Sequence, residues 1–449
     1  MQIREFLENV CEQIKYKPIR NEISEELKDH IEENMEAYVL EGVQEKEAEE
    51  KAIEQMGNAE EIGKKLNKIH RPKLDWKLLI IVIAVLCFSF LVAITKEINC
   101  SDTGNLITKY IVSLILGVIC SSLIYFMDYR KICKYSNVLY IIATLSIILV
   151  VHYGQTVNGI YYLNLGIITI SPAVIAMPLY IMAFVGFLQN IDKESIVQIK
   201  KISNKTFNIV KTIVLSLISL IMFITIPSIT SAFIVGMVYL IIATAKILQL
   251  QENKARYLIS LWGVILILGA FVVTSYVGVQ PYNWERLTIS FRPEEDPSGS
   301  GWVGVNQKQI IQSANLFGEA NDTSDALNIF DEGTHFAFIS ILAHYGWVIS
   351  IGMVVAVILL CIKLMINSIT IKDVYGKLLT IGISSLFILQ SVFNLLMNLN
   401  MGIKASFNIP LISHSCAGLV INMMCLALVF CIYRRKDILI EGVNSDCIT

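Results

Sequence analysis

The chain has 449 residues, of which 55% are hydrophobic and 16% are charged, and its mean hydropathy is +0.61. A soluble domain carries about 25% charged residues, so this composition excludes an ordinary soluble enzyme. The net charge of −2 gives no basis for nucleic-acid binding. The ten cysteines are scattered and form no C-x-x-C pair, so they support neither a zinc site nor a disulfide framework.

Residues 1–75 differ in composition from the rest, because they hold about half of the acidic residues of the chain. Their apolar positions recur at helical spacing, and Gly42 and Gly57 interrupt the runs. We expect a compact bundle of three or four short helices without a catalytic constellation. The runs Glu22–Glu32 and Glu47–Gly57 resemble the permease-prefix domain of bacterial envelope proteins. Such a bundle is either a solvated cap or a cytoplasmic docking or sensing module.

Ten later segments are apolar enough and long enough to cross a bilayer. They predict an all-α fold: a polytopic membrane protein with ten transmembrane helices in residues 76–436, preceded by the small N-terminal helical bundle. The predicted spans are residues 77–95, 107–127, 137–153, 165–188, 208–226, 228–248, 257–279, 336–362, 377–400 and 411–433.

Lysine and arginine cluster in every even-numbered connection between these spans and are sparse in the others. By the positive-inside rule, both termini are expected in the cytoplasm, with the bundle of residues 1–75 and the tail of residues 437–449. The large loop of residues 280–335 is then expected outside, in a multi-pass protein of the plasma membrane. This loop is acidic in balance and is the one polar island large enough to host chemistry.

The loop and the helices after it carry a series of motifs. The loop contains the run Arg286-Leu-Thr-Ile-Ser-Phe-Arg-Pro-Glu-Glu-Asp-Pro-Ser-Gly-Ser-Gly301 and ends at Thr334-His-Phe-Ala-Phe338. Gln390-x-x-x-Asn394-x-x-x-Asn398 and Ile409-Pro-Leu-Ile-Ser413 follow. In order and spacing, these runs resemble the RodA/FtsW/SpoVE family, the SEDS proteins, and the resemblance extends from about residue 78 to residue 436.

The resemblance implies an activity and partners. SEDS proteins of cell shape and division polymerise the lipid-linked disaccharide-peptide precursor of peptidoglycan at the outer membrane face. They are usually paired with a transpeptidase of the penicillin-binding class. An outer-facing aspartate of the family, within the run T-D-F-I-F, is thought to deprotonate the acceptor sugar hydroxyl. The resemblance indicates no certain cofactor, although that carboxylate could help to hold a divalent cation, and it predicts no dedicated metal site.

His335 stands where the family has this aspartate. A neutral imidazole can act as a general base, because its ordinary pKa is about 6.5. Asp331 precedes it by four residues, so the two side chains would share one face of a helix and the carboxylate could orient the ring. We therefore take His335 and Asp331 as candidate catalytic residues. The alternative is that the site has lost its activity and that His335 is an ordinary polar residue.

Other positions differ from the family in the same direction. The family run N-G-A-R-R-W is Asn158-Gly-Ile-Tyr-Tyr-Leu163 here, so the arginines are absent. A buried Glu and Lys of the family correspond to Val174 and Met177, and a third buried charge, an Asp, is also absent, although Pro172 and Pro227 remain. Charges inside a membrane are costly and normally functional. Their absence fits a retained fold with altered or absent catalysis.

Four further residues are candidates for substrate binding. Arg286 could bind a diphosphate through charge-assisted hydrogen bonds. Asn394 and Asn398 give one helix a polar stripe, which serves either to bond neighbouring helices or to line a groove for the lipid diphosphate. Ser413 ends the motif before the last span.

Three functions remain open on the sequence. The first is a divergent SEDS glycosyltransferase. The second is a catalytically inactive SEDS homologue that acts as a membrane scaffold or regulator of wall synthesis. The third is a transporter of the lipid-linked precursor, which the scarcity of ionisable residues in the spans disfavours.

Overall fold

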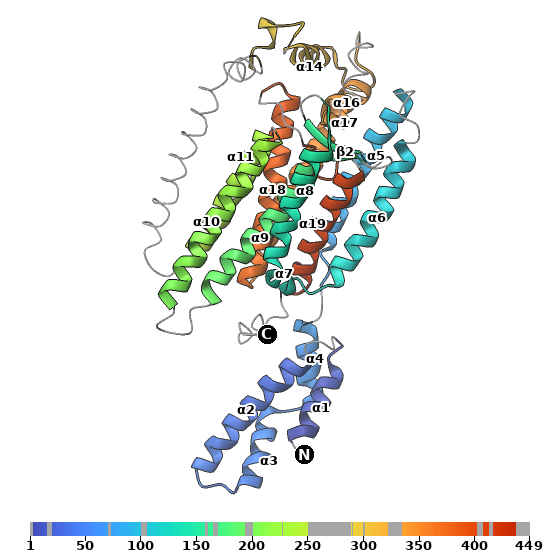
Figure 1. The fold of residues 1–449 in the computed structure, drawn as a ribbon. Coiled ribbons are helices and arrows are strands. Elements are labelled where there is room, and N and C mark those ends of the chain that lie inside the picture. Colours follow the sequence, from blue (N-terminus) through green and yellow to red (C-terminus); the bar gives the residue numbers. More distant parts are fainter. Residues whose placement is uncertain are drawn as a thin grey trace. The chain divides into compact units, whose positions relative to one another are not determined.

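The contacts within the chain divide the computed structural model into two compact units (Figure 1). One is formed by Met1–Asp75 together with Ile432–Thr449, and the other is a membrane unit that spans Trp76–Cys431. The predicted seventh span, residues 257–279, lies outside the part of the chain that the structure describes, as do Arg286, Asp331 and Ser413. The described residues are 3–15, 20–70, 73–99, 106–157, 160–164, 169–193, 201–226, 228–249, 289, 291–299, 301–321, 335–401, 407–412 and 416–436.

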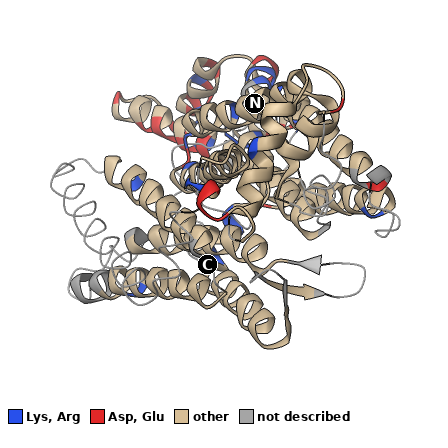
Figure 2. Ribbon diagram, turned by 90° about the horizontal axis from the view of Figure 1, so that it is seen from above, with Lys and Arg blue, Asp and Glu red and all other residues tan. Residues whose placement is uncertain are grey.

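Four helices form the N-terminal unit, in agreement with the expected bundle. Apolar side chains at helical spacing, among them Phe6, Val10 and Ile31, are buried between them. Gly42 and Gly57 follow the ends of two helices with φ angles of 93° and 92°, which glycine adopts without strain. Figure 2 shows Asp and Glu concentrated on these helices. They are α1 (Ile3–Gln13), α2 (Arg20–Leu40), α3 (Glu45–Met56) and α4 (Ala59–His70).

The described part of the membrane unit contains nine helices that are long and apolar enough to cross a membrane, consistent with the ten predicted. The chain is therefore a multi-pass membrane protein, and Figure 2 shows that its membrane helices are mostly uncharged. The nine are α5 (Trp76–Asn99), α6 (Leu106–Phe126), α8 (Ser136–Tyr153), α9 (Pro172–Lys193), α10 (Lys201–Thr225), α11 (Ile229–Leu248), α17 (Trp347–Thr370), α18 (Val374–Asn398) and α19 (Cys416–Arg434).

Helix α18 is the centre of the membrane unit, because 67% of its span is buried, against 17% for α6 and for α10. Small residues let its neighbours approach closely. A Cβ added at Gly382 would lie 2.8 Å from a methyl group of Ile181 in α9 and 3.0 Å from one of Ile242 in α11. At its start, Asp373 accepts hydrogen bonds from the backbone N–H of Gly376 at 2.7 Å and from the hydroxyl of Tyr129 at 3.0 Å. The apolar faces of α6 and α10 are left for lipid.

The predicted eighth span, residues 336–362, is not one helix. It consists of the short helix α16 (Ala337–Tyr345) and of α17, which are separated at Gly346. Gly346 has φ 82° and ψ −176°, a conformation that only glycine adopts readily. At nine residues α16 is too short to cross a bilayer, and most of its residues are buried.

A loop segment fills the break between the two helices. The backbone N–H groups of Trp347 and Val348 donate to the carbonyls of Asn315 and Leu316 at 3.0 and 3.2 Å. In return, the N–H of Ala320 donates to the carbonyl of Ala343 at 2.7 Å. These bonds satisfy groups that a helix end leaves unpaired, so they stabilise the interruption.

Two further predicted spans start earlier than the helices of the structure. The fourth predicted span starts at residue 165, but α9 starts at Pro172, because β3 (Thr169–Ile170) pairs antiparallel with β2 (Ile160–Asn164). With β1 (Gln155–Val157), these strands form a small sheet in the order β1-β2-β3. The tenth predicted span starts at residue 411, but α19 starts at Cys416.

The irregular elements lie at both ends of the helix bundle. Figure 1 shows β2, α16 and the short helix α14 (Trp302–Ser313) near one end and α7 (Arg130–Lys134) at the other. Strand β2 comes close to the start of α16, because the hydroxyl of Tyr162 lies 3.4 Å from the ring of His335.

Replacing Gly346 by alanine is expected to destabilise the membrane unit. The added Cβ would lie 2.6 Å from the carbonyl oxygen of Asn315 and 2.8 Å from that of Leu316, at a positive φ. Backbone strain of this kind costs about 1–3 kcal/mol before the clash is counted. A lower midpoint of thermal unfolding in detergent would show it.

Gly352→Ala in α17 is the matched control. Its Cβ would meet one atom, of Phe88, at an ordinary 3.5 Å, and alanine favours helix, so the midpoint should stay or rise. An equal loss for both variants would contradict the assigned role of Gly346.

Candidate active site

His335 lies in a turn just before α16, and its backbone is held by two side chains of α18. The amide groups of Asn394 and Asn398 both donate to the carbonyl oxygen of His335, each at 3.1 Å. The two asparagines are one helical turn apart and therefore share a face of α18. This face determines where the His335 backbone lies.

Both asparagines are fully buried. Asn394 also donates to the carbonyl of Phe407 at 2.8 Å, and Asn398 donates to the side-chain oxygen of Asn394 at 2.9 Å. The side-chain oxygen of Asn398 accepts from the N–H of Ile339, at 3.4 Å. Of the two roles open for this stripe, these bonds fit the one in which the amides hold neighbouring segments together. The candidate role in substrate binding gains no support from side chains without exposed surface.

The imidazole ring of His335 is contacted at both nitrogens. Nδ1 lies 2.8 Å from the side-chain oxygen of Asn408, and Nε2 lies 3.4 Å from the hydroxyl of Tyr162 in β2. Burial raises the pKa of the Tyr162 phenol, so this hydroxyl stays protonated. The predicted partner of the ring, Asp331, lies outside the described residues, so the Asp331–His335 pair stays a prediction.

Tyr162 and Asn408 are missed by sequence reasoning, although each lies beside a motif. Tyr162 belongs to the run in which two tyrosines correspond to the arginines of the family. Asn408 directly precedes the motif that ends at Ser413. A polar side chain next to a motif was the available signal, but only the fold joins these positions to His335.

The first polar residue of the α18 stripe has a different neighbour. The amide of Gln390 lies 3.9 Å from the sulfur of Met177 in α9, where the family has a buried lysine. This contact involves two uncharged groups. Within the described residues, no group of three or more His, Cys, Asp or Glu side chains could hold a metal ion.

The run Pro293–Gly301 forms a tight turn in front of α14. The N–H of Gly301 donates to the carbonyl of Asp296 at 3.0 Å, and a Cβ on Gly301 would lie 2.1 Å from the carbonyl of Pro293. The glycine is therefore needed for close packing. Lys308 pairs with Glu294, which lowers the pKa of that carboxyl group, and Arg292 pairs with Glu295 at 3.3 Å.

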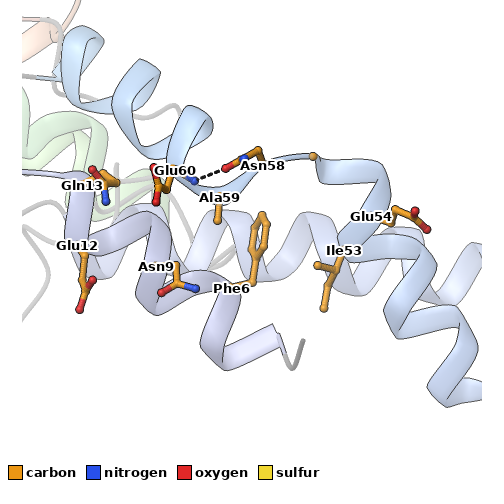
Figure 3. Close-up of a pocket in the computed structure, with 10 residues that line it drawn as sticks. Phe6, Asn9, Glu12, Gln13, Ile53, Glu54, Asn58, Ala59 and Glu60 are labelled. Atoms are coloured by element: carbon orange, nitrogen blue, oxygen red, sulfur yellow. Dashed lines mark hydrogen bonds between the residues drawn. The ribbon is translucent and has the colours of Figure 1, made fainter.

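A separate cavity of about 500 Å³ lies in the N-terminal unit (Figure 3). Phe6, Ile53 and Ala59 form its apolar floor, and polar and acidic side chains surround them. Glu60 at its rim is paired with Lys64 at 3.1 Å. The lining contains no nucleophile with an adjacent base, so the cavity fits binding better than chemistry. Its polar lining comprises Asn9, Glu12, Gln13, Glu54, Asn58 and Glu60.

The architecture defines a class, a multi-pass membrane protein with a broken helix and a polar site at one end of the bundle. Residues 74–438 match the family model described as cell cycle protein, FtsW/RodA/SpoVE. The chain belongs to this family.

Individual relatives are distant. The chain is 23% identical over 310 residues to a probable peptidoglycan glycosyltransferase FtsW of Buchnera aphidicola, which covers 68% of this chain and 82% of the relative. It is 29% identical over 146 residues to the peptidoglycan glycosyltransferase RodA of Treponema pallidum, over 31% and 33% of the two chains.

The fold is similar to that of two solved structures. One is a chain from a peptidoglycan synthase complex that coordinates polymerization and crosslinking, with a TM-score of 0.61 at 21% identity, over 81% of this chain and 98% of the other. The other is the rod shape determining protein RodA of Thermus thermophilus, with a TM-score of 0.54 at 18% identity, over 81% and 97%.

Asn394→Ala is expected to lower the stability of the membrane unit and to loosen the His335 turn. It would leave the buried carbonyl of Phe407 without this donor, and an unsatisfied buried group costs about 1–3 kcal/mol. The measurements are the thermal midpoint and proteolysis near residue 335.

Asn306→Ala is the control, because among the described residues the Asn306 amide bonds within its own helix, to the carbonyl of Trp302 at 2.8 Å. If Asn394→Ala lowered the thermal midpoint no more than Asn306→Ala, the hydrogen bonds from Asn394 to the carbonyls of His335 and Phe407 would contribute little to stability.

Proposed function

We propose that this chain is a divergent SEDS glycosyltransferase that polymerises a lipid-linked disaccharide-peptide precursor of peptidoglycan. Family membership and the relatives named as peptidoglycan glycosyltransferases support the reaction class. The observation that carries the proposal is the position of His335. It corresponds to the family's aspartate, and its ring is held by Asn408 and Tyr162 at one end of the helix bundle.

In the proposed reaction, Nε2 of His335 accepts the proton of the acceptor sugar hydroxyl. The oxygen forms a bond to the anomeric carbon of the donor, and the bond from that carbon to the lipid diphosphate breaks. The diphosphate leaves with the electron pair. Arg286 and Ser413 remain candidates for binding the diphosphate, and Asp331 remains a candidate second partner of the base.

The proposed orientation has both termini in the cytoplasm and the active site at the outer face of the plasma membrane. The basic residues of the even-numbered connections support it. A transpeptidase of the penicillin-binding class is the proposed partner, because a structurally similar chain is part of a peptidoglycan synthase complex that couples polymerization to crosslinking. The N-terminal unit is proposed as a separate cytoplasmic domain of residues 1–75.

A non-catalytic scaffold is the second candidate. It is favoured by the uncharged contact of Gln390 with Met177 and by the cavity in the N-terminal unit, which could receive a partner. The two candidates differ in whether any polymer forms when the purified protein receives precursor.

His335→Ala is expected to reduce polymerisation of labelled lipid-linked precursor by about 10²–10⁴-fold, the usual contribution of a general base. Wild-type activity should fall as the pH drops and the imidazole becomes protonated, because protonation removes the lone pair. His335→Asp should keep activity to lower pH, since a carboxylate stays ionised there.

His344→Ala serves as the control, because His344 lies near the end of α16 rather than at its start. A wild-type protein that forms no polymer with any transpeptidase partner would exclude the glycosyltransferase and favour the scaffold.

A further inference from the structure

The His335 ring is fixed by residues from two segments that lie 173 and 73 positions away in the sequence. An amide oxygen accepts hydrogen bonds and cannot donate. The 2.8 Å contact between Nδ1 and the side-chain oxygen of Asn408 is therefore a bond in which Nδ1–H donates. In a neutral imidazole, this leaves the lone pair on Nε2.

The Nε2 lone pair faces a hydroxyl that can donate to it. Tyr162 stays protonated because burial raises the pKa of its phenol. The distance of 3.4 Å is long for a hydrogen bond between these atoms, so the contact is weak. An incoming sugar hydroxyl at an ordinary hydrogen-bond distance would compete with it effectively.

Asn394 links the two sides of this arrangement. Its amide donates to the carbonyl of His335 at 3.1 Å and to the carbonyl of Phe407 at 2.8 Å, next to Asn408. One buried side chain thus holds the backbone of the base and the backbone of its partner. The Nδ1–Asn408 geometry follows from this clamp and needs no ligand.

We propose that Asn408 fixes His335 in the tautomer with Nδ1 protonated, and that the Tyr162 hydroxyl occupies Nε2 until an acceptor hydroxyl replaces it. Asn408 is then a positioning residue, and Tyr162 protects the base. The catalytic meaning of this arrangement rests on the proposed function, whereas the state of the ring does not.

Two described groups contact the ring of His335. Tyr162 is the titratable group that faces it from β2, and the uncharged amide of Asn408 faces it from residues 407–412. Asn394 and Asn398 of α18 contact the backbone carbonyl of His335 instead. A carboxylate introduced at position 408 would therefore act directly on the imidazolium. Its effect on the pKa of His335 should be large, because an opposite charge within about 4–6 Å favours the charged form.

The test is the rate at which diethyl pyrocarbonate modifies each histidine of the full-length protein in lipid nanodiscs, followed by mass spectrometry from pH 5 to pH 8. Only the unprotonated ring nitrogen reacts, so the pH midpoint reports the pKa of each histidine. Asn408→Asp should raise the midpoint of His335 by about one unit or more. Asn408→Leu should lower it, because the imidazolium loses an acceptor. His344 is the internal reference.

If the His335 midpoint moves in opposite directions in Asn408→Asp and Asn408→Leu, Asn408 acts on the ring directly. A general structural disturbance would move the midpoint in the same direction in both variants. Tyr162→Phe, which removes one oxygen atom, should raise the plateau rate of His335 several-fold by freeing Nε2. Unchanged midpoints in both Asn408 variants would overturn the role of Asn408. An unchanged or lower plateau in Tyr162→Phe would overturn the role of Tyr162, even if an Asn408 variant failed to fold.

Polymerisation of labelled precursor by the same proteins separates this inference from the proposed function. If the wild type is active, the acid limb of the pH–activity profile should shift in Asn408→Asp by as much as the His335 midpoint does. An acid limb that does not shift would overturn the role of His335 as the catalytic base. If the wild type forms no polymer, the proposed function fails, and the modification rates still decide the state of the ring.

Discussion

The amide of Asn394 makes the contact on which the rest of the site depends. It is fully buried and donates to the backbone of residues 335 and 407, which belong to different segments of the chain. An amide buried without partners costs about 2–7 kcal/mol, so the helix tolerates Asn394 and Asn398 only when both segments are in place. The position of the His335 ring beside Asn408 is a consequence of this requirement, which comes from packing and not from a ligand.

The interruption at Gly346 is the second constraint. Because the helix is interrupted there, α16 is a short element of nine residues, most of them buried, between His335 and the long helix α17. The backbone of residues 315–320 satisfies the helix ends on both sides of the break. The turn at Pro293–Gly301 and α14 are thereby joined to the membrane helices through backbone hydrogen bonds, which depend little on side-chain identity.

The residues that shape the backbone are distinct from the charged residues that the family carries, and this explains how the chain can keep the family's fold while its polar residues differ. The groups that shape the backbone are present: Gly301 at a close approach, Gly346 at a positive φ and the asparagines of α18. The charges that the resemblance leads one to expect are not: Met177 contacts the Gln390 amide, and a histidine takes the place of the aspartate. Chemistry at this site would depend on one imidazole that contacts the uncharged groups of Asn408 and Tyr162, and therefore on its tautomer.

The sequence alone determined the membrane class, the order and approximate positions of the nine described spans, and the family, because a bilayer requires about 20 apolar residues for each helix and family motifs are local in sequence. It also singled out His335, Asn394 and Asn398. The tertiary structure decided the break at Gly346, which the uninterrupted apolar run conceals, and the start of α9 after a strand. It alone brought Tyr162 and Asn408 to His335, since no periodicity links residues 173 and 73 positions apart, and only packing across β2, α18 and the segment before α19 makes them neighbours.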